Sequence, residues 1–236
     1  MDKKKTFYVV IDGTDGSGKE TQSILLKDNL AHAYKSGIND IVKLSFPMYG
    51  NKSCDTVNRY LQGEYGEDAT EVNPYVASVP YFIDRFESYK SLWGKVAADA
   101  NIVIMDRYTV SNVVHQAAKL QGNIAKLKYV EWLYELEYKN GGLPEPDLII
   151  VLDMPPEKAA ELRTKRADKT GQSDIHESNR AFMDASYNNA LHMADLLDWE
   201  VVKCVTEDGS IKTVDDIQKD ILVVFFEKYN EWLDKK

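Results

Sequence analysis

Three glycines and a lysine follow an apolar segment close to the start of the chain. The segment Phe-Tyr-Val-Val-Ile-Asp at 7–12 runs directly into a glycine-rich sequence at 13–21, and a helix-compatible segment follows at 22–34. Glycine lets the backbone of such a turn fold so that its N–H groups converge on one point, and the N-terminus of the next helix adds positive potential there. A strand, the sequence GxxxxGK and a helix in this order predict a P-loop that binds the phosphates of a nucleoside triphosphate.

The residues that we expect to contact the nucleoside triphosphate are those of the loop and of the turn that follows it: Gly13, Thr14, Asp15, Gly16, Ser17, Gly18, Lys19, Glu20 and Thr21. Lys19 supplies a mobile cation for the β- and γ-phosphates. The motif usually has Ser or Thr after the lysine as a magnesium ligand, but Glu20 stands at that position and the hydroxyl comes one residue later, on Thr21. Either Asp15 and Thr21 hold the magnesium ion, in part through water, or other carboxylates do.

The elements that must position this loop follow from five short apolar segments with helical stretches between them. The predicted strands are 7–12, 41–46, 102–106, 148–153 and 201–205, and the predicted helices include 75–98, 111–138 and 214–233. Continuously apolar strands indicate a parallel sheet covered on both faces. We therefore expect an α/β fold, a three-layer, doubly wound, parallel five-stranded sheet of the P-loop NTPase type. Ligands bind at the carboxyl ends of such strands, which places Asp106 and Arg107 beside the P-loop.

Composition limits the function classes. A length of 236 residues with 44% hydrophobic residues suits one large domain, residues 1–236. The net charge of −9 and the lack of a long basic block argue against a nucleic-acid partner. The longest apolar stretches, 148–152 and 221–226, are too short to span a membrane. Cys54 and Cys204 have neither metal-ligand spacing nor a disulfide pattern, so we expect reduced thiols in a cytoplasmic protein.

Three further motifs follow the P-loop along the chain. They are Phe-Pro-Met-Tyr-Gly at 46–50, Tyr-Phe-Ile-Asp-Arg at 81–85 and Asp-Arg-Tyr-Thr-Val-Ser at 106–111, the last followed by His115 and Gln116. With Asp15 as the third residue of the P-loop, this order resembles the thymidylate kinase family over nearly the whole chain. The resemblance implies phosphorylation of thymidine monophosphate (dTMP) by ATP and magnesium, for dTTP synthesis, in a homodimer.

Arg107 is the residue that we expect to bind the acceptor phosphate, because a guanidinium offers paired N–H donors that a lysine cannot copy. Its alternative role is a structural ion pair with Asp106. The resemblance implies that Asp15 accepts a hydrogen bond from the 3′-hydroxyl of the substrate or helps to hold magnesium. A role for Asp15 in stabilising the turn is the alternative.

The resemblance also names the residues that bind the rest of the acceptor. Tyr81 and Arg85 lie four positions apart and therefore on one helical face, where the ring stacks on thymine and the guanidinium donates to O4. Without the resemblance, Tyr81 would be interpreted as a core aromatic residue. His115 stands where many relatives have tyrosine near the 2′ carbon of the sugar, so discrimination against ribose differs here, unless the ring points elsewhere. The full acceptor set is Phe46, Tyr49, Tyr81, Arg85, Arg107, Ser111, Asn112, His115 and Gln116.

A basic segment after the fourth strand is predicted to be a mobile lid, at about 163–174, that closes over ATP. The P-loop carries no arginine before Lys19. Relatives of this kind place their catalytic cations in the lid, which indicates Arg163 and Arg166 beside Lys19, Asp15 and Arg107 as catalytic residues. The alternative is an ordinary solvated charge cluster.

Other functions remain as alternatives at this stage. The first is another P-loop kinase, acting on CMP, UMP, AMP or a deoxynucleoside. The second is a regulatory nucleotide switch, since residues 168–171 read DxxG as in GTPases, although they lie in the basic segment and no NKxD sequence follows. A catalytically silent binding protein would require losses of function that the sequence does not show, with Glu20 as the one candidate.

Overall fold

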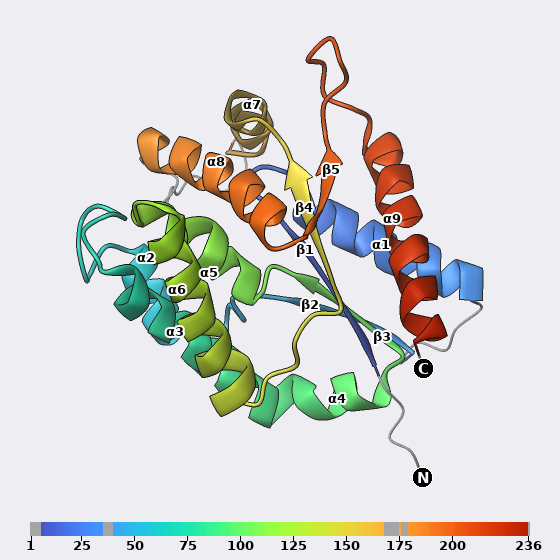
Figure 1. Ribbon diagram of the computed structural model, residues 1–236, viewed down its shortest axis with the longest axis horizontal. Coiled ribbons are helices and arrows are strands. Elements are labelled where there is room, and N and C mark those ends of the chain that lie inside the picture. Colours follow the sequence, from blue (N-terminus) through green and yellow to red (C-terminus); the bar gives the residue numbers. More distant parts are fainter. Residues whose placement is uncertain (1–5, 35–39, 168–174, 176–178, 236) are drawn as a thin grey trace.

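A parallel sheet of five strands forms the centre of the molecule (Figure 1). The computed structural model describes residues 6–34, 40–167, 175 and 179–235, and within 163–167 it describes the backbone only. The strands are β1 (Phe7–Asp12), β2 (Ile41–Ser45), β3 (Ile102–Asp106), β4 (Leu148–Asp153) and β5 (Glu200–Lys203). Their order in the sheet is β2-β3-β1-β4-β5, and every neighbouring pair is parallel. The predicted five-stranded parallel sheet is therefore confirmed.

Helices cover both faces of this sheet (Figure 1). The helices of the described part are α1 (Lys19–Tyr34), α2 (Asp55–Leu61), α3 (Pro74–Ser88), α4 (Gly94–Asp99), α5 (Thr109–Gln116), α6 (Asn123–Tyr134), α7 (Pro156–Ala167), α8 (Arg180–Leu196) and α9 (Val214–Asp234). Helices α1 and α9 pack on one face, and α4, α5 and α8 pack on the other. This arrangement is the three-layer architecture that the sequence predicted.

Alternate side chains of β1 point into the two layers of the core. Phe7, Val9 and Ile11 pack with residues of α1 and α9, whereas Val10 packs with residues of α5 and α8. All four side chains are fully buried. A strand that is buried on both faces must be apolar at every position, which is why segment 7–12 shows no alternation.

Two predicted helices are interrupted in the structure. The segment 75–98 forms α3, a π-helical turn at Tyr89–Trp93 and α4. The segment 111–138 forms α5, a short 3₁₀ turn, α6 and a π-helical turn at Glu135–Asn140. Gly122 precedes α6 with a φ of 79°, a conformation outside the right-handed helical region, so one continuous helix is excluded there. The terminal helix, by contrast, follows the prediction closely.

Helix α7 runs through Ala167, so Arg163 and Arg166 lie on a helix rather than in a loop. The remainder of the predicted lid, residues 168–174, lies outside the described residues, and so does the DxxG sequence at 168–171. Within the part of the chain that is described, no helix combines the length and the apolar character that a membrane crossing requires.

Candidate active site

The P-loop lies between the end of β1 and the start of α1, as predicted. Gly13 has a φ of 151°. A Cβ atom at Gly13 would lie 2.9 Å from Ser17 Oγ and 3.0 Å from the carbonyl oxygen of Leu152. Both the conformation and the lack of space therefore require glycine. The loop ends at Lys19, where the free N–H groups of the first turn of α1 give an anion-binding end.

Asp12 fixes the start of this loop, a role that the sequence did not indicate. Its Oδ1 accepts the N–H of Gly13 at 2.7 Å, and its Oδ2 accepts the hydroxyl of Ser111 at 2.6 Å. Asp12 is fully buried, and burial raises its pKa although Arg107 and Lys19 oppose the shift. Because Ser111 lies in the first turn of α5, Asp12 ties the P-loop to the helix that carries four of the nine predicted acceptor residues.

Lys19 crosses the loop and lies close to Asp15. Its side chain is 7% exposed, and its Nζ donates to the carbonyl oxygen of Thr14 at 3.0 Å and lies 3.5 Å from Asp15 Oδ1. Burial and the neighbouring Arg107 lower the pKa of Lys19, against the raising effect of Asp15 and Asp12. The loop thus holds a buried cation among carbonyl and carboxylate oxygens, at the point where phosphates are predicted to bind.

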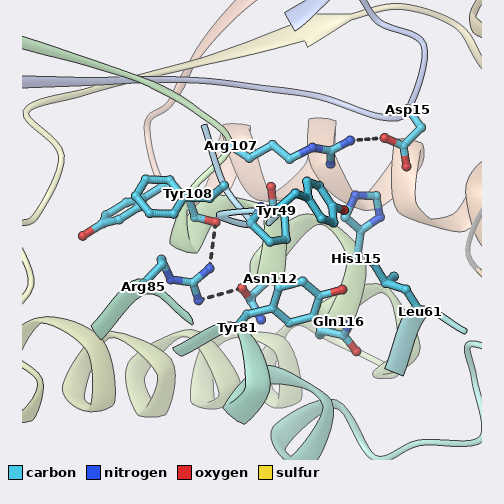
Figure 2. Close-up of a pocket in the computed structure, with 13 residues that line it drawn as sticks. Asp15, Tyr49, Leu61, Tyr81, Arg85, Arg107, Tyr108, Asn112, His115 and Gln116 are labelled. Atoms are coloured by element: carbon cyan, nitrogen blue, oxygen red, sulfur yellow. Dashed lines mark hydrogen bonds and ion pairs between the residues drawn. The ribbon is translucent and has the colours of Figure 1, made fainter. Parts of the chain in front are cut away.

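The ion-pair partner of Arg107 is Asp15, rather than Asp106 as in the predicted structural alternative (Figure 2). Arg107 follows β3 with a φ of 63°, an uncommon conformation for a residue with a side chain and often a sign of function. Burial would raise the pKa of Asp15, but Arg107 and Lys19 outweigh it and hold this pKa well below its usual range. Burial would lower the pKa of Arg107, but the charges of Asp15 and Asp12 outweigh it and raise this pKa. Both groups are charged at neutral pH.

A pocket opens beside this ion pair (Figure 2). All nine predicted acceptor residues line it: Phe46, Tyr49, Tyr81, Arg85, Arg107, Ser111, Asn112, His115 and Gln116. Asp15 lines it as well, so it adjoins the P-loop. Leu61, from α2, is a lining residue that no sequence motif indicated. Residues from five separate parts of the chain, at 15, 46–49, 61, 81–85 and 107–116, thus line one pocket.

Aromatic rings form much of the wall of this pocket. Tyr81 is partly exposed and packs at the edge of a buried cluster that includes Tyr60, with 6.1 Å between the two ring centroids. Phe46 is buried against Trp93 and Tyr108, whereas Tyr49 is 63% exposed. Tyr49 therefore lies at the mouth of the pocket and Phe46 belongs to its floor.

The loop that carries Phe46 and Tyr49 is anchored to α3 by Asp84. The carboxylate of Asp84 accepts the N–H of Met48 at 2.9 Å and the hydroxyl of Ser53 at 2.8 Å. Asp84 belongs to the motif at 81–85, but its sequence position alone did not reveal this contact across 31 and 36 residues. The second and third motifs are therefore parts of one structural unit.

Arg85 differs most from its predicted environment. Its side chain is 2% exposed and forms an ion pair with Glu137, which is fully buried. Arg85 Nη2 also donates to Asn112 Oδ1 at 2.9 Å, and Nη1 lies 3.5 Å from the carbonyl oxygen of Tyr108 (Figure 2). The sequence indicated Arg85 but not Glu137, which lies 52 residues away. The guanidinium is thus a fixed part of the pocket wall and not a mobile side chain.

The oxygen donors near the P-loop suit a magnesium ion that arrives with a nucleotide. Thr21 and Glu20 are exposed on the first turn of α1, and Asp15 contacts Arg107 and Lys19. Among the residues with described positions, no group of three or more His, Cys, Asp or Glu side chains could hold a metal. Magnesium needs no such group, because one or two carboxylates with water and substrate phosphates complete its coordination.

Comparison with known proteins gives one consistent result. A family model for thymidylate kinase matches residues 11–217. The thymidylate kinase of Mycobacterium tuberculosis (strain H37Rv) is 32% identical over 162 residues, which are 68% of this chain and 72% of that protein. The thymidylate kinase of an Exiguobacterium species is 27% identical over 210 residues, 89% of this chain and 90% of that protein.

A solved structure extends the likeness to the fold. The structure of thymidylate kinase from Candida albicans covers 96% of this chain and 93% of its own, with a TM-score of 0.67 and 20% sequence identity. The resemblance seen in the four motifs is confirmed by the family model and by the relatives. The chain belongs to the thymidylate kinase family.

Proposed function

We infer that this chain phosphorylates dTMP to the diphosphate with ATP as the phosphoryl donor, in the synthesis of dTTP. One observation carries the proposal: acceptor residues named from three separate sequence motifs line one pocket that adjoins the P-loop. Membership of the thymidylate kinase family supports the same activity. A regulatory nucleotide switch, one of the alternatives, binds a single nucleotide and does not require a second pocket for an acceptor beside the P-loop.

The P-loop binds the donor. The backbone N–H groups of residues 13–18 and the ammonium group of Lys19 surround the β- and γ-phosphates of ATP. Asp15 and, through water, Thr21 are the residues that we assign to magnesium, which neutralises phosphate charge when it is bound. Their positions beside Lys19 and on the first turn of α1 support this assignment.

The acceptor phosphate binds at the end of the pocket that adjoins the P-loop. Arg107 and its partner Asp15 both line this end of the pocket, so the Arg107 guanidinium can hold the acceptor phosphate in line with the donor. Tyr49, at the mouth, donates its hydroxyl to the same phosphate. Asp15 keeps Arg107 in place and accepts a hydrogen bond from the 3′-hydroxyl of the sugar. Holding two polyanions in line is most of what phosphoryl transfer requires of a protein.

The base binds between Tyr81 and the start of α5. Tyr81 stacks on thymine, and its partly exposed ring supports that role. Arg85 and Asn112 present N–H donors to the O4 carbonyl, and the amino group of cytosine cannot accept these bonds. Gln116 lies one helical turn after Asn112 on the same face and contacts the far side of the base.

The sugar lies between Phe46, Ser111 and His115. The buried His115 ring is 6.3 Å from the ring of Phe182 and lines the pocket, which supports a position against the 2′ carbon. Imidazole is smaller than the phenol that many relatives have there. We therefore propose that this enzyme excludes ribonucleotides less strictly than a relative with tyrosine.

Arg163 and Arg166 are proposed to reach the transferring phosphoryl group from the lid. Replacing either with methionine is expected to lower kcat by about a hundred- to a thousand-fold, because their charge acts mainly in the transition state. The KM values for both substrates should change far less. Steady-state kinetics on the two variants checks this result, with Lys165→Met and Lys169→Met as matched controls. Equal small effects at all four positions would identify a solvated charge cluster.

Release of ADP tests whether the chain is a kinase at all. We expect rapid ADP release only when ATP, magnesium and dTMP are all present. Slow release that dTMP does not accelerate would support a nucleotide switch, and nucleotide binding without any release would support a silent binding protein. Either result would contradict the proposed function.

We further propose a homodimer formed through α3. Val76 and Val79 on this helix are 62% and 39% exposed, and exposed apolar side chains on adjacent turns of one helix fit a helix-to-helix interface. The double variant Val76→Arg/Val79→Arg is expected to be monomeric by light scattering. Val223→Arg is the control, because Val223 is equally exposed on α9 and should leave the dimer intact. A monomeric wild type would overturn this proposal.

The remaining proposals concern organisation and location. We propose one kinase domain over residues 1–236, with the lid as its mobile part. A cytoplasmic location is supported by Cys54 and Cys204, both of which are free and buried thiols. Small nucleotides, rather than nucleic acid or membrane, are the proposed partners, in keeping with the net charge of −9.

A further inference from the structure

Glu137 is a fully buried carboxylate outside the pocket, and the proposed reaction does not use it directly. It lies in the π-helical turn Glu135–Asn140. This turn is locked in place, because Gly141 N–H donates to the carbonyl oxygen of Leu136 at 2.8 Å and Leu143 N–H donates to that of Glu137 at 3.1 Å. A Cβ atom at Gly141 would lie 2.7 Å from the Glu137 carbonyl oxygen and from Phe82. Turns of this kind occur frequently at functional sites.

The contact between Glu137 and Arg85 is bidentate. Arg85 Nε donates to Glu137 Oε2 at 3.0 Å, and Arg85 Nη2 donates to Glu137 Oε1. Burial would lower the pKa of Arg85, but the charge of Glu137 outweighs it and raises this pKa. A buried ion pair contributes little to stability on average, because desolvation offsets the attraction. Its presence is better explained by what it positions.

Arg85 determines which way the amide of Asn112 faces. Arginine can only donate hydrogen bonds, so the Asn112 atom that lies 2.9 Å from Arg85 Nη2 must be the carbonyl oxygen. The Nδ2 group of Asn112 is consequently the other end of the amide. It is buried, and it has no hydrogen-bond partner among the described residues. Asn112 lines the pocket, so this unsatisfied donor is available to a ligand there.

We propose that Glu137 is a positioning residue for base selection: it fixes Arg85, and Arg85 in turn makes Asn112 a donor toward the base. This proposal rests on the proposed function, because it takes a pyrimidine monophosphate as the acceptor. A base with a carbonyl group opposite Asn112 Nδ2, such as thymine or uracil, satisfies the buried donor. Cytosine presents an amino group there, which cannot accept a hydrogen bond, so the N–H donors of Arg85 and Asn112 that face the base stay unsatisfied.

Glu137→Gln tests the proposal with almost no change in volume. Glutamine retains one acceptor but places an N–H donor against the guanidinium, so Arg85 and Asn112 lose their fixed orientation. We expect the ratio of kcat/KM for dTMP to that for dCMP to fall about ten-fold, the usual effect of one misplaced buried hydrogen bond. The loss should appear as a higher KM for dTMP, with kcat within about two-fold of wild type. Glu137→Asp, which keeps the charge, should restore part of the ratio.

Two further variants separate positioning from general structural damage. Glu135→Gln is the matched control, because Glu135 lies on the same turn but its side chain is 53% exposed, and the ratio should stay at the wild-type value. Arg85→Met and Arg85→Met/Glu137→Gln should discriminate equally poorly, because Glu137 acts through Arg85. The double variant removes both buried charges, so it is expected to fold even if Glu137→Gln does not.

Several results would overturn the proposal. One is an unchanged dTMP-to-dCMP ratio in Glu137→Gln, whatever its melting temperature. Another is a further loss of discrimination when Glu137→Gln is added to Arg85→Met, and a third is wild-type discrimination in the double variant. The wild-type enzyme reports separately on the proposed function. If it prefers dUMP, dTMP is the wrong acceptor, and the same variants measured with dUMP against dCMP still decide the role of Glu137. A wild-type preference for dCMP would overturn both proposals.

Discussion

Lys19→Ala is expected to reduce kcat by at least about a thousand-fold while the melting temperature stays close to that of wild type. Lys19 is the buried cation of the P-loop, and its Nζ lies among oxygens of Thr14 and Asp15. Charge that moves between two phosphates during transfer is stabilised there without rearrangement of solvent. Steady-state kinetics and thermal denaturation of the purified variant check both parts of this expectation.

Lys27→Ala is the matched control for Lys19→Ala. Lys27 lies two turns further along α1 and is not part of the loop. We expect unchanged turnover in this variant. Turnover near the wild-type value in a folded Lys19→Ala enzyme would mean that the P-loop is not the catalytic phosphate site, and the account of the donor site would then be wrong.

Arg107→Met should also have a large effect, a fall in kcat/KM for dTMP of about a hundred- to a thousand-fold. The variant removes the proposed contact with the acceptor phosphate and also the partner of Asp15. Arg107→Lys keeps a charge but loses the paired donors, so we expect it to recover only part of the activity. The KM for ATP should change little in both variants.

The pH dependence of Arg107→Met provides a second measurement. In the wild type the pKa of Asp15 is held well below its usual range, so Asp15 stays ionised throughout the mildly acidic and neutral range. Without Arg107, the raising effect of burial is opposed by fewer cations, and the pKa of Asp15 rises. Loss of activity toward acid pH should therefore begin at a higher pH in the variant. Identical acid limbs in the two enzymes would show that Arg107 does not control Asp15.

The strands and the pocket were predictable from the sequence for one physical reason. Strands buried on both faces are continuously apolar, and β1, β3 and β4 start and end at the predicted residues. The carboxyl ends of parallel strands meet at one edge, so motifs that follow β1, β2 and β3 had to converge. Their convergence explains why the acceptor residues after β2 and β3 line one pocket, whereas Tyr81 and Arg85 reach the same pocket from α3.

What the sequence did not predict depends on contacts between distant segments. The pairing of Arg85 with Glu137 spans 52 residues, and no spacing or motif marks it. The same holds for Asp84, which anchors the loop after β2. Glycine is the sequence feature shared by the helix breaks. Gly94 and Gly141 directly follow the two π-helical turns, where a Cβ atom would lie 2.5 Å from the Tyr89 carbonyl oxygen and 2.7 Å from the Glu137 carbonyl oxygen. Gly122 has a positive φ.

The most direct test of the central claim is a competition between acceptors in one reaction. Purified enzyme receives equal concentrations of dTMP, dCMP, dUMP and dAMP with limiting ATP and magnesium, and mass spectrometry follows the diphosphates. We expect dTDP to form first, while dCMP and dAMP stay unconverted until dTMP is nearly exhausted. Preferential formation of dCDP or dADP would contradict the assignment of this pocket to thymine and, with it, the proposed function.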